Sequence, residues 1–106
     1  MGNLLFCSGQ IPLDPKTGQI VGTDIESQTE QVMKNVLGLL ESQGLGAGNI
    51  VKATVFLKNM GEFPKFNETY QKYLKEPYPA RSTVEVARLP KDVQVEVEVL
   101  AFNPNA

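Results

Sequence analysis

A run of alternating residues near the C-terminus constrains the fold of this chain most strongly. Its apolar and polar members follow one another without exception: Val93, Gln94, Val95, Glu96, Val97, Glu98 and Val99. This period of two predicts a half-buried strand, with the valines on the core face and the carboxylates on the other face. Glutamate is a poor strand former, so Glu96 in the middle of the strand suggests a role beyond folding.

A second alternating run precedes the first and contains Arg81. Between the two runs, residues 89–92 read Leu-Pro-Lys-Asp, which fits a reversal initiated by proline. We therefore expect an antiparallel hairpin in which Arg81 faces the neighbourhood of Val99. Glu96 then faces Val84, and the arginine and the glutamate are offset by ~10 Å along the strands. This spacing leaves room for a small molecule between them, although the pair can equally meet across two subunits.

The pattern alone leaves two interpretations of these charges open. An antiparallel hairpin commonly carries charged residues on its water-facing side. Against this, Arg81 follows Tyr78-Pro79-Ala80, a rigid and apolar approach that is unusual for a solvated arginine. A guanidinium and a carboxylate held on rigid strands are also well placed to form a site.

Composition excludes several classes of function. The chain has 106 residues, enough for one domain with a small core. It has 10 basic and 12 acidic residues, so no basic surplus is available for binding nucleic acid. The absence of histidine excludes a Ser-His triad and most zinc sites. Cys7 is the only cysteine and no stretch reads as a signal peptide or a membrane span, so we expect a cytoplasmic protein.

Two stretches predict helices. The first covers residues 24–43 and ends at Gly44, and Thr23 with Glu26 forms a capping box at its start. The second follows a strand predicted at residues 50–57.

Asn59 caps this second helix, and Pro64 falls in its first turn, where proline is tolerated. The residues of its apolar face are Phe63, Phe66, Tyr70 and Leu74. Asn67 lies beside that face, either as a satisfied core amide or as part of a pocket.

The remaining strands are predicted at residues 4–8 and 19–21, with a tight turn at residues 14–18 between them. Turn chemistry at residues 2–3 has only Met1 before it, which suggests that an upstream strand is missing. The order of elements predicts an α+β fold, a mixed sheet with two helices packed on one face. The other face then meets water or a neighbouring subunit, where Glu96 and Glu98 would need partners.

Two long motifs resemble the Rid (YjgF-type) enamine/imine deaminase family. They are Ser8-Gly9-Gln10-Ile11-Pro12 and the stretch from Pro79-Ala80-Arg81-Ser82 through Glu85-Val86-Ala87-Arg88-Leu89-Pro90. The resemblance extends from Gly2 to about Ala101. It implies a chorismate-mutase-like fold, a homotrimer with sites at the subunit interfaces, and hydrolysis of 2-enamino and 2-imino acids to 2-keto acids and ammonia.

The resemblance also implies roles for individual residues. Arg81 matches the arginine that binds the substrate carboxylate, and Glu96 matches the acid that holds the attacking water. The other matching residues line the site: Ser8, Gly9, Phe66, Asn67 and Thr83. Thr83 stands where many members have a cysteine, so thiol chemistry is excluded at this position. Members usually carry a further N-terminal segment with a first strand and a tyrosine that reaches the site, so residues 1–106 are expected to form a single, N-terminally truncated domain.

Hydrolysis of an imine suits these residues, because an imine is already electrophilic and needs neither a metal nor another cofactor. We therefore expect a deaminase of substrates such as 2-aminoacrylate and 2-iminopropanoate, without nucleic-acid or membrane partners. The first alternative is a non-enzymatic protein that binds a small metabolite in the same interfacial cleft. The second is a chorismate-mutase-like isomerase, which would need more cationic groups than Arg81 and Arg88 to stabilise a dianion.

Overall fold

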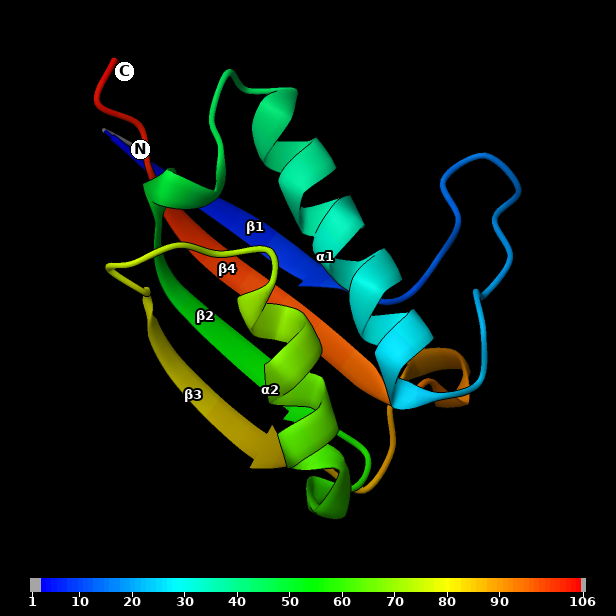
Figure 1. Cartoon of the computed structure of the whole chain (residues 1–106). Coiled ribbons are helices and arrows are strands. Elements are labelled where there is room, and N and C mark those ends of the chain that lie inside the picture. The colour runs from blue at the N-terminus through cyan, green and yellow to red at the C-terminus, as the bar shows by residue number, and fades with distance from the viewer. Residues whose placement is uncertain (1–2, 106) are drawn as a thin grey trace.

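The computed structural model describes residues 3–105 as a sheet of four strands with two helices (Figure 1). The strands are β1 (Leu4–Gln10), β2 (Ile50–Leu57), β3 (Ala80–Glu85) and β4 (Val95–Phe102). The helices are α1 (Ile25–Glu41) and α2 (Phe63–Gln71), with short 3₁₀ turns at Ala47–Asn49, Met60–Glu62 and Pro90–Asp92.

Most of these elements lie where the sequence predicts them. The strand predicted at residues 19–21 is an exception, because it is reduced to a single bridge between Leu13 and Ile20. The C-terminal strand also begins later and ends later than predicted, since it runs from Val95 to Phe102 and does not include Val93. The turn predicted at residues 2–3 lies partly outside the described residues.

The strands form one mixed sheet in the order β1-β4-β2-β3. β4 pairs antiparallel with β1 and with β2, and β3 pairs parallel with β2. The predicted hairpin between β3 and β4 is therefore wrong, because β2 lies between these two strands. The relative register is nevertheless as expected: Ala53 of β2 aligns with both Arg81 and Val99, and Phe56 aligns with both Val84 and Glu96.

The connection from β3 to β4 crosses the end of β2 instead of making a tight hairpin turn. The Val86 N–H donates to the Leu57 carbonyl at 2.9 Å, and the Lys58 N–H donates to the Gln94 carbonyl at 3.0 Å. These bonds tie the connection to Leu57, the last residue of β2, and to Lys58, which follows it. The reversal predicted around Pro90 is present, but it lies within this longer crossing and does not bring β3 and β4 side by side.

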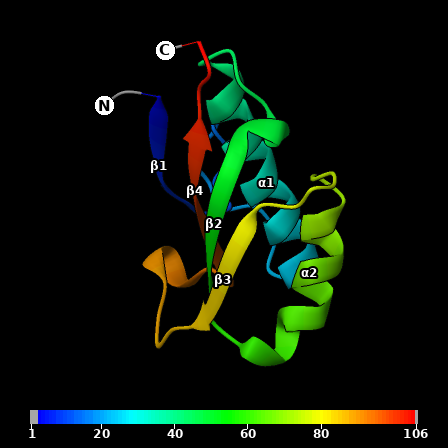
Figure 2. The ribbon, with the colours of Figure 1, turned by 90° about the vertical axis from the view of Figure 1, so that its left-hand side faces the viewer.

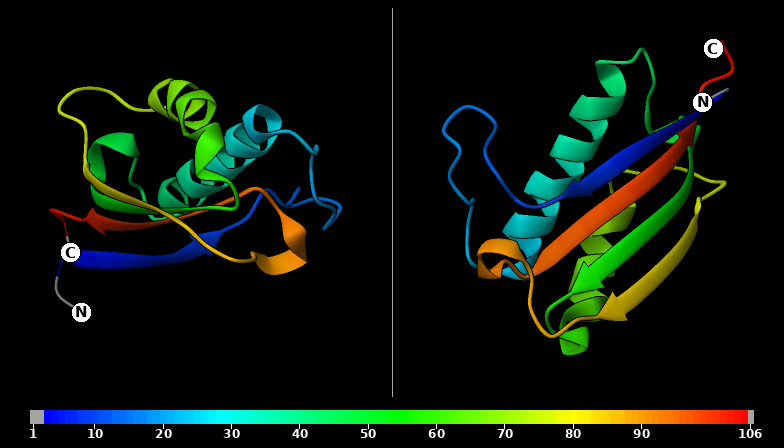
Figure 3. Two further views of the ribbon diagram at one scale, coloured as in Figure 1. Left: turned by 90° about the horizontal axis from the view of Figure 1, so that it is seen from below. Right: turned by 180° about the vertical axis from the view of Figure 1, so that it is seen from behind.

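Both helices cover one face of the sheet, as Figure 2 and the left view of Figure 3 show. The alternation in β4 determines which residues meet them. Four helix-facing residues of β4 are at most 5% exposed: Val95, Val97, Val99 and Ala101. Burying a valine side chain stabilises a fold by about 1.5 kcal/mol or more, so a slip of one residue in this strand would be costly. The predicted α+β architecture is confirmed.

The start of α1 differs from the prediction by one residue. Asp24, and not Thr23, is the N-cap. Its carboxylate accepts hydrogen bonds from the Ser27 hydroxyl at 2.6 Å and the Ser27 N–H at 3.0 Å, and these bonds lower the pKa of Asp24. Asp and Thr are both good caps, but a carboxylate can accept both of these bonds. None of the described helices is long and apolar enough to cross a membrane.

The start of α2 follows the sequence closely. Asn59 caps the preceding 3₁₀ turn, where its side chain accepts a hydrogen bond from the Gly61 N–H at 2.8 Å. Pro64 lies in the first turn of α2, as predicted. The helix therefore begins at a fixed point and directs Asn67 toward the edge strand β3, where it bonds to Arg81.

Candidate active site

Arg81 lies on the edge strand β3 and points toward α2. Its backbone pairs with Ala53, a buried residue of the helix-facing side of β2. Its Nη1 donates a hydrogen bond of 2.6 Å to the Asn67 side-chain oxygen. Asn67 is half-buried, and this bond joins its side-chain oxygen to Arg81, which lines a hollow, so its role in a pocket stays a prediction.

Thr83 shares this side of the sheet, because it lies two residues beyond Arg81. Together with Arg81 it lines a hollow of about 580 Å³, whose other walls are Met60, Phe63 and Pro64. The Thr83 hydroxyl oxygen is buried and has no hydrogen-bond partner among residues 3–105. We call Arg81, Asn67 and Thr83 the arginine half-site.

Phe66 is placed differently from the other predicted site residues of α2. Its side chain is completely buried, and its ring stacks on Tyr70 with 5.2 Å between the ring centroids. Within this chain the ring of Phe66 therefore supports α2 from the core and does not line a hollow that a ligand can enter. The physical reason is helical spacing, which turns Phe66 inward while the neighbouring Asn67 meets Arg81 at the edge.

Glu96 lies in the middle of β4 on the face of the sheet that the helices leave open. It pairs with Phe56 and is half-buried. Burial raises the pKa of the Glu96 carboxyl above its usual value, and the nearby Glu98 carboxylate raises it further. A carboxyl with a raised pKa is a better proton acceptor once it is ionised.

Gly9 lies directly against this carboxylate. The register between β1 and β4 shifts between Cys7 and Gln10, so the strand has an irregularity at Gly9. A Cβ atom at Gly9 would overlap the Glu96 side-chain oxygen, so glycine is what allows this close approach. Ser8, on the same strand, is exposed. We call Ser8, Gly9 and Glu96 the glutamate half-site.

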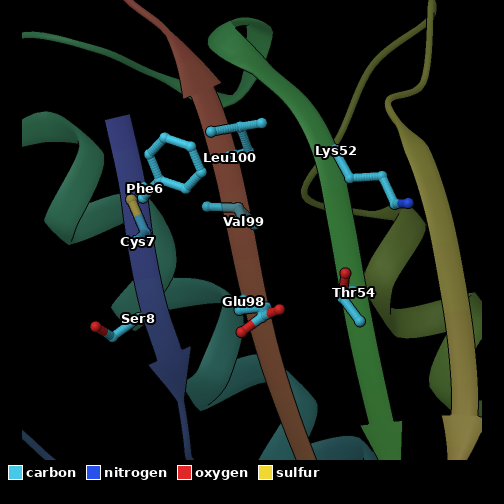
Figure 4. A pocket seen from close by; sticks show the side chains of 8 residues that line it. All are labelled: Phe6, Cys7, Ser8, Lys52, Thr54, Glu98, Val99 and Leu100. Carbon is cyan, nitrogen blue, oxygen red and sulfur yellow. The ribbon is translucent and has the colours of Figure 1, made fainter. Parts of the chain in front are cut away.

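The open face carries a second hollow, of about 320 Å³, next to the glutamate half-site. Figure 4 shows that its walls come from β1, β2 and β4 and that the helices lie behind them. Its lining residues are Phe6, Cys7, Ser8, Lys52, Thr54, Glu98, Val99 and Leu100. Of these, the sequence had indicated only Ser8 as a site residue. The alternating pattern of residues 50–57 placed Lys52 and Thr54 on one face of their strand. This pattern does not predict which face of the sheet the helices leave open.

The structure thus separates the predicted site residues into two groups. Arg81 is on the helix-covered side of the sheet, whereas Glu96 is on the open side. With β2 lying between their strands, the two side chains do not converge within one chain. Among the described residues no group of three or more His, Cys, Asp or Glu side chains could hold a metal ion.

The fold and these motifs define the class of protein. The chain matches the model of the Endoribonuclease L-PSP family over residues 1–103. It belongs to this family, which includes the Rid and YjgF proteins.

Individual relatives are similar over nearly the whole chain. The 2-iminobutanoate/2-iminopropanoate deaminase of Escherichia coli (strain K12) is 48% identical over 104 residues, which cover 95% of this chain and 80% of that protein. A RutC family protein of Pyrococcus horikoshii is 52% identical over 101 residues, with the same coverage of 95% and 80%.

Solved structures show the same fold. The crystal structure of the yjgF gene product of E. coli has a TM-score of 0.89 and 45% identity, and the match covers 96% of this chain and 82% of that one. The crystal structure of E. coli TdcF with bound serine has a TM-score of 0.90 and 40% identity, with coverage of 97% and 83%.

Proposed function

We propose that this chain is a hydrolytic deaminase that converts reactive 2-imino and 2-enamino acids, such as 2-iminopropanoate and 2-aminoacrylate, to 2-keto acids and ammonia. The observation that carries the proposal is the state of Arg81. Its guanidinium is half-buried beside a hollow, yet it has no carboxylate partner among residues 3–105, where the ion pair found is Arg88–Asp92. The similarity to the E. coli deaminase also supports a deaminase function.

In this proposal Arg81 binds the carboxylate of the substrate. The hydrogen bond to Asn67 uses one N–H of Nη1, and the other donors of the guanidinium remain available for a forked contact with two carboxylate oxygens. Because Asn67 is neutral, the positive charge of Arg81 is left for the ligand. Thr83 lines the same hollow, although its buried hydroxyl oxygen is not open to it.

Glu96 acts as the general base. Its carboxylate takes a proton from water as the water oxygen bonds to C2 of the iminium, and the C=N electron pair moves to nitrogen. The same carboxyl then returns this proton to the nitrogen. The C2–N bond then breaks as the C2 hydroxyl gives its proton to the Glu96 carboxylate, which leaves a 2-keto acid and ammonia, and the carboxyl later releases this proton to water. An enamine enters this sequence when its C3 takes up a proton from water, which gives the iminium directly. Base catalysis of this kind typically accelerates a reaction by ~10²–10⁴-fold.

A complete site needs two copies of the chain, since the half-sites lie on opposite sides of one sheet. We infer that the arginine half-site of one subunit meets the glutamate half-site of its neighbour in a homotrimer. The open face supports an interface, because it exposes large apolar side chains of three strands. These side chains are Leu4 (43%), Phe6 (64%), Val84 (43%) and Phe102 (42%).

The endoribonuclease activity in the family's name finds little support in this sequence. The chain carries 10 basic and 12 acidic residues and no histidine. Binding of a polyanion needs a surplus of positive charge on one surface, and none is evident from this composition.

The test is ammonia release from 2-iminopropanoate, formed in the assay from alanine by an amino-acid oxidase. The parent chain is expected to accelerate the release of ammonia, and Arg81→Ala is expected not to. Arg88→Ala is a matched control, because Arg88 is exposed and bonds to Asp92 at 2.8 Å, away from both half-sites. If the parent binds pyruvate but releases no ammonia, a metabolite-binding role replaces the enzymatic one.

A further inference from the structure

The guanidinium of Arg81 lies against two aromatic rings of α2. Its central carbon is 5.2 Å from the ring centroid of Phe63 and 5.0 Å from the ring centroid of Tyr70. These two residues are two helical turns apart, so their rings lie on the same face of α2. Phe66 lies between them in sequence, with its ring 6.4 Å from that of Phe63 and 5.2 Å from that of Tyr70. Because Phe66 is completely buried, this row of rings is anchored in the core.

These contacts hold Arg81 without neutralising it. An aromatic ring attracts a cation through its electron-rich face and takes away none of its charge. The tyrosine is no exception, since burial raises the pKa of Tyr70 even though the positive charge of Arg81 opposes this effect. The hydroxyl therefore stays protonated and is not a counterion. The third partner, Asn67, is also neutral.

The rings also fix where the guanidinium can go. Two hollows flank Arg81: the one of about 580 Å³ that includes Phe63, and another of about 210 Å³ that includes Tyr70 and Tyr78. A free arginine side chain samples many rotamers and loses this freedom when it binds a ligand. If rings and a hydrogen bond have already restricted it, less freedom is lost at the moment of binding.

We propose that Phe63 and Tyr70 are positioning residues that hold the Arg81 guanidinium in the orientation required to bind a carboxylate. This inference rests on the proposed function, in which Arg81 binds the carboxylate of the substrate. The rings act through Arg81, and Phe63 is in addition a wall of the hollow that Arg81 lines. Their removal therefore weakens carboxylate binding, and it affects KM more than kcat.

The test measures pyruvate binding to the full chain by calorimetry. Phe63→Leu and Tyr70→Leu each remove a ring and keep an apolar side chain. Each is expected to weaken pyruvate binding by about 3–30-fold, the range that corresponds to one cation–π contact. Tyr70→Phe restores the ring without the hydroxyl, which has no hydrogen-bond partner among residues 3–105, and is expected to recover most of the loss.

Tyr73→Leu is the matched control. Tyr73 follows α2, packs against the same core and is not one of the two rings near the Arg81 guanidinium. The Tyr73→Leu variant loses a ring of the same size, and its affinity for pyruvate is expected to equal that of the parent. Thermal unfolding of each variant verifies folding, and Phe63→Leu carries the test if Tyr70→Leu does not fold, because Phe63 is only partly buried.

The possible outcomes separate this inference from the proposed function. Folded Leu variants that bind pyruvate as tightly as the parent would overturn the positioning role. The positioning role would also be overturned if Tyr73→Leu weakened pyruvate binding as much as Phe63→Leu and Tyr70→Leu do. The same would hold if Tyr70→Phe bound pyruvate no more tightly than Tyr70→Leu. A parent chain that binds pyruvate but releases no ammonia contradicts only the deaminase activity. A parent that neither binds pyruvate nor releases ammonia contradicts both proposals.

Discussion

Arg81 and Glu96 lie on opposite faces of one sheet. Arg81 aligns with Ala53 of β2, and Glu96 aligns with Phe56 of the same strand. The two residues are therefore offset by three positions along β2. Arg81 bonds to Asn67 on the helix-covered side, whereas Glu96 shares the open side with Glu98. The sequence had left open whether the two groups meet within one subunit or across two. This arrangement favours two subunits.

The first prediction is that two inactive variants restore activity when they are mixed. The Arg81→Ala variant keeps an intact glutamate half-site, and the Glu96→Gln variant keeps an intact arginine half-site. If sites form between neighbouring copies of a homotrimer, unfolding and refolding an equal mixture should recover about a quarter of the parent activity. No recovery in refolded mixed trimers would show that both groups act from the same chain.

The second prediction concerns the shape of the arginine. Arg81→Ala is expected to weaken binding of a 2-keto acid by about 10–100-fold, because a charge-assisted and forked contact is lost. Arg81→Lys should recover little, since an ammonium cannot form the forked contact or stack in the same way on the two rings. Calorimetric titration with pyruvate measures both effects. Full affinity in the lysine variant would mean that only the charge matters.

The third prediction separates rate from binding at Glu96. Glu96→Gln is expected to lower kcat by about 10²–10⁴-fold through the loss of a general base, with a smaller effect on pyruvate affinity. The parent kcat should fall as the pH falls through the raised pKa of Glu96, because the protonated carboxyl cannot accept a proton from water. Equal losses of rate and affinity in Glu96→Gln would point to a binding role.

The fourth prediction uses Glu98 to shift this pH dependence. Glu98 is the second cause of the raised pKa of Glu96, after burial. Glu98→Gln removes the like charge, so the pKa of Glu96 should fall and the acid limb of the kcat profile should move to lower pH. A profile that stays in place would show that the limb reports another group.

The fifth prediction tests the close approach of Gly9 to Glu96. A methyl group at Gly9 would overlap the end of the Glu96 side chain, which is flexible and can move away. Gly9→Ala should therefore fold but displace the carboxylate, and a displacement of about 1 Å can lower a rate by ~10²-fold. Gly48→Ala is the control, because a Cβ there meets nothing within 4 Å. Parent-like rates in Gly9→Ala would remove Glu96 from the catalytic role.

Much of the fold follows from the sequence by itself. The alternation of β4 determined which residues face the core, because a strand slipped by one residue would bury Glu96 and Glu98 and expose the valines. The position of Pro64 and the apolar spacing of α2 determined where that helix begins and which face it buries. Gly44, three residues after the last residue of α1, has a φ of 75°, a conformation in which glycine has no steric penalty.

The tertiary structure decided how these elements combine. A local pattern cannot tell whether β3 pairs with β4 or with β2, because both pairings satisfy the same alternation, and only the packed sheet places β2 between them. That insertion left the relative register of Arg81 and Glu96 unchanged. The face that each side chain occupies depends on where the helices pack, which involves contacts between residues far apart in sequence. The split of the candidate site into two half-sites, and the two rings beside the Arg81 guanidinium, became visible only at this level.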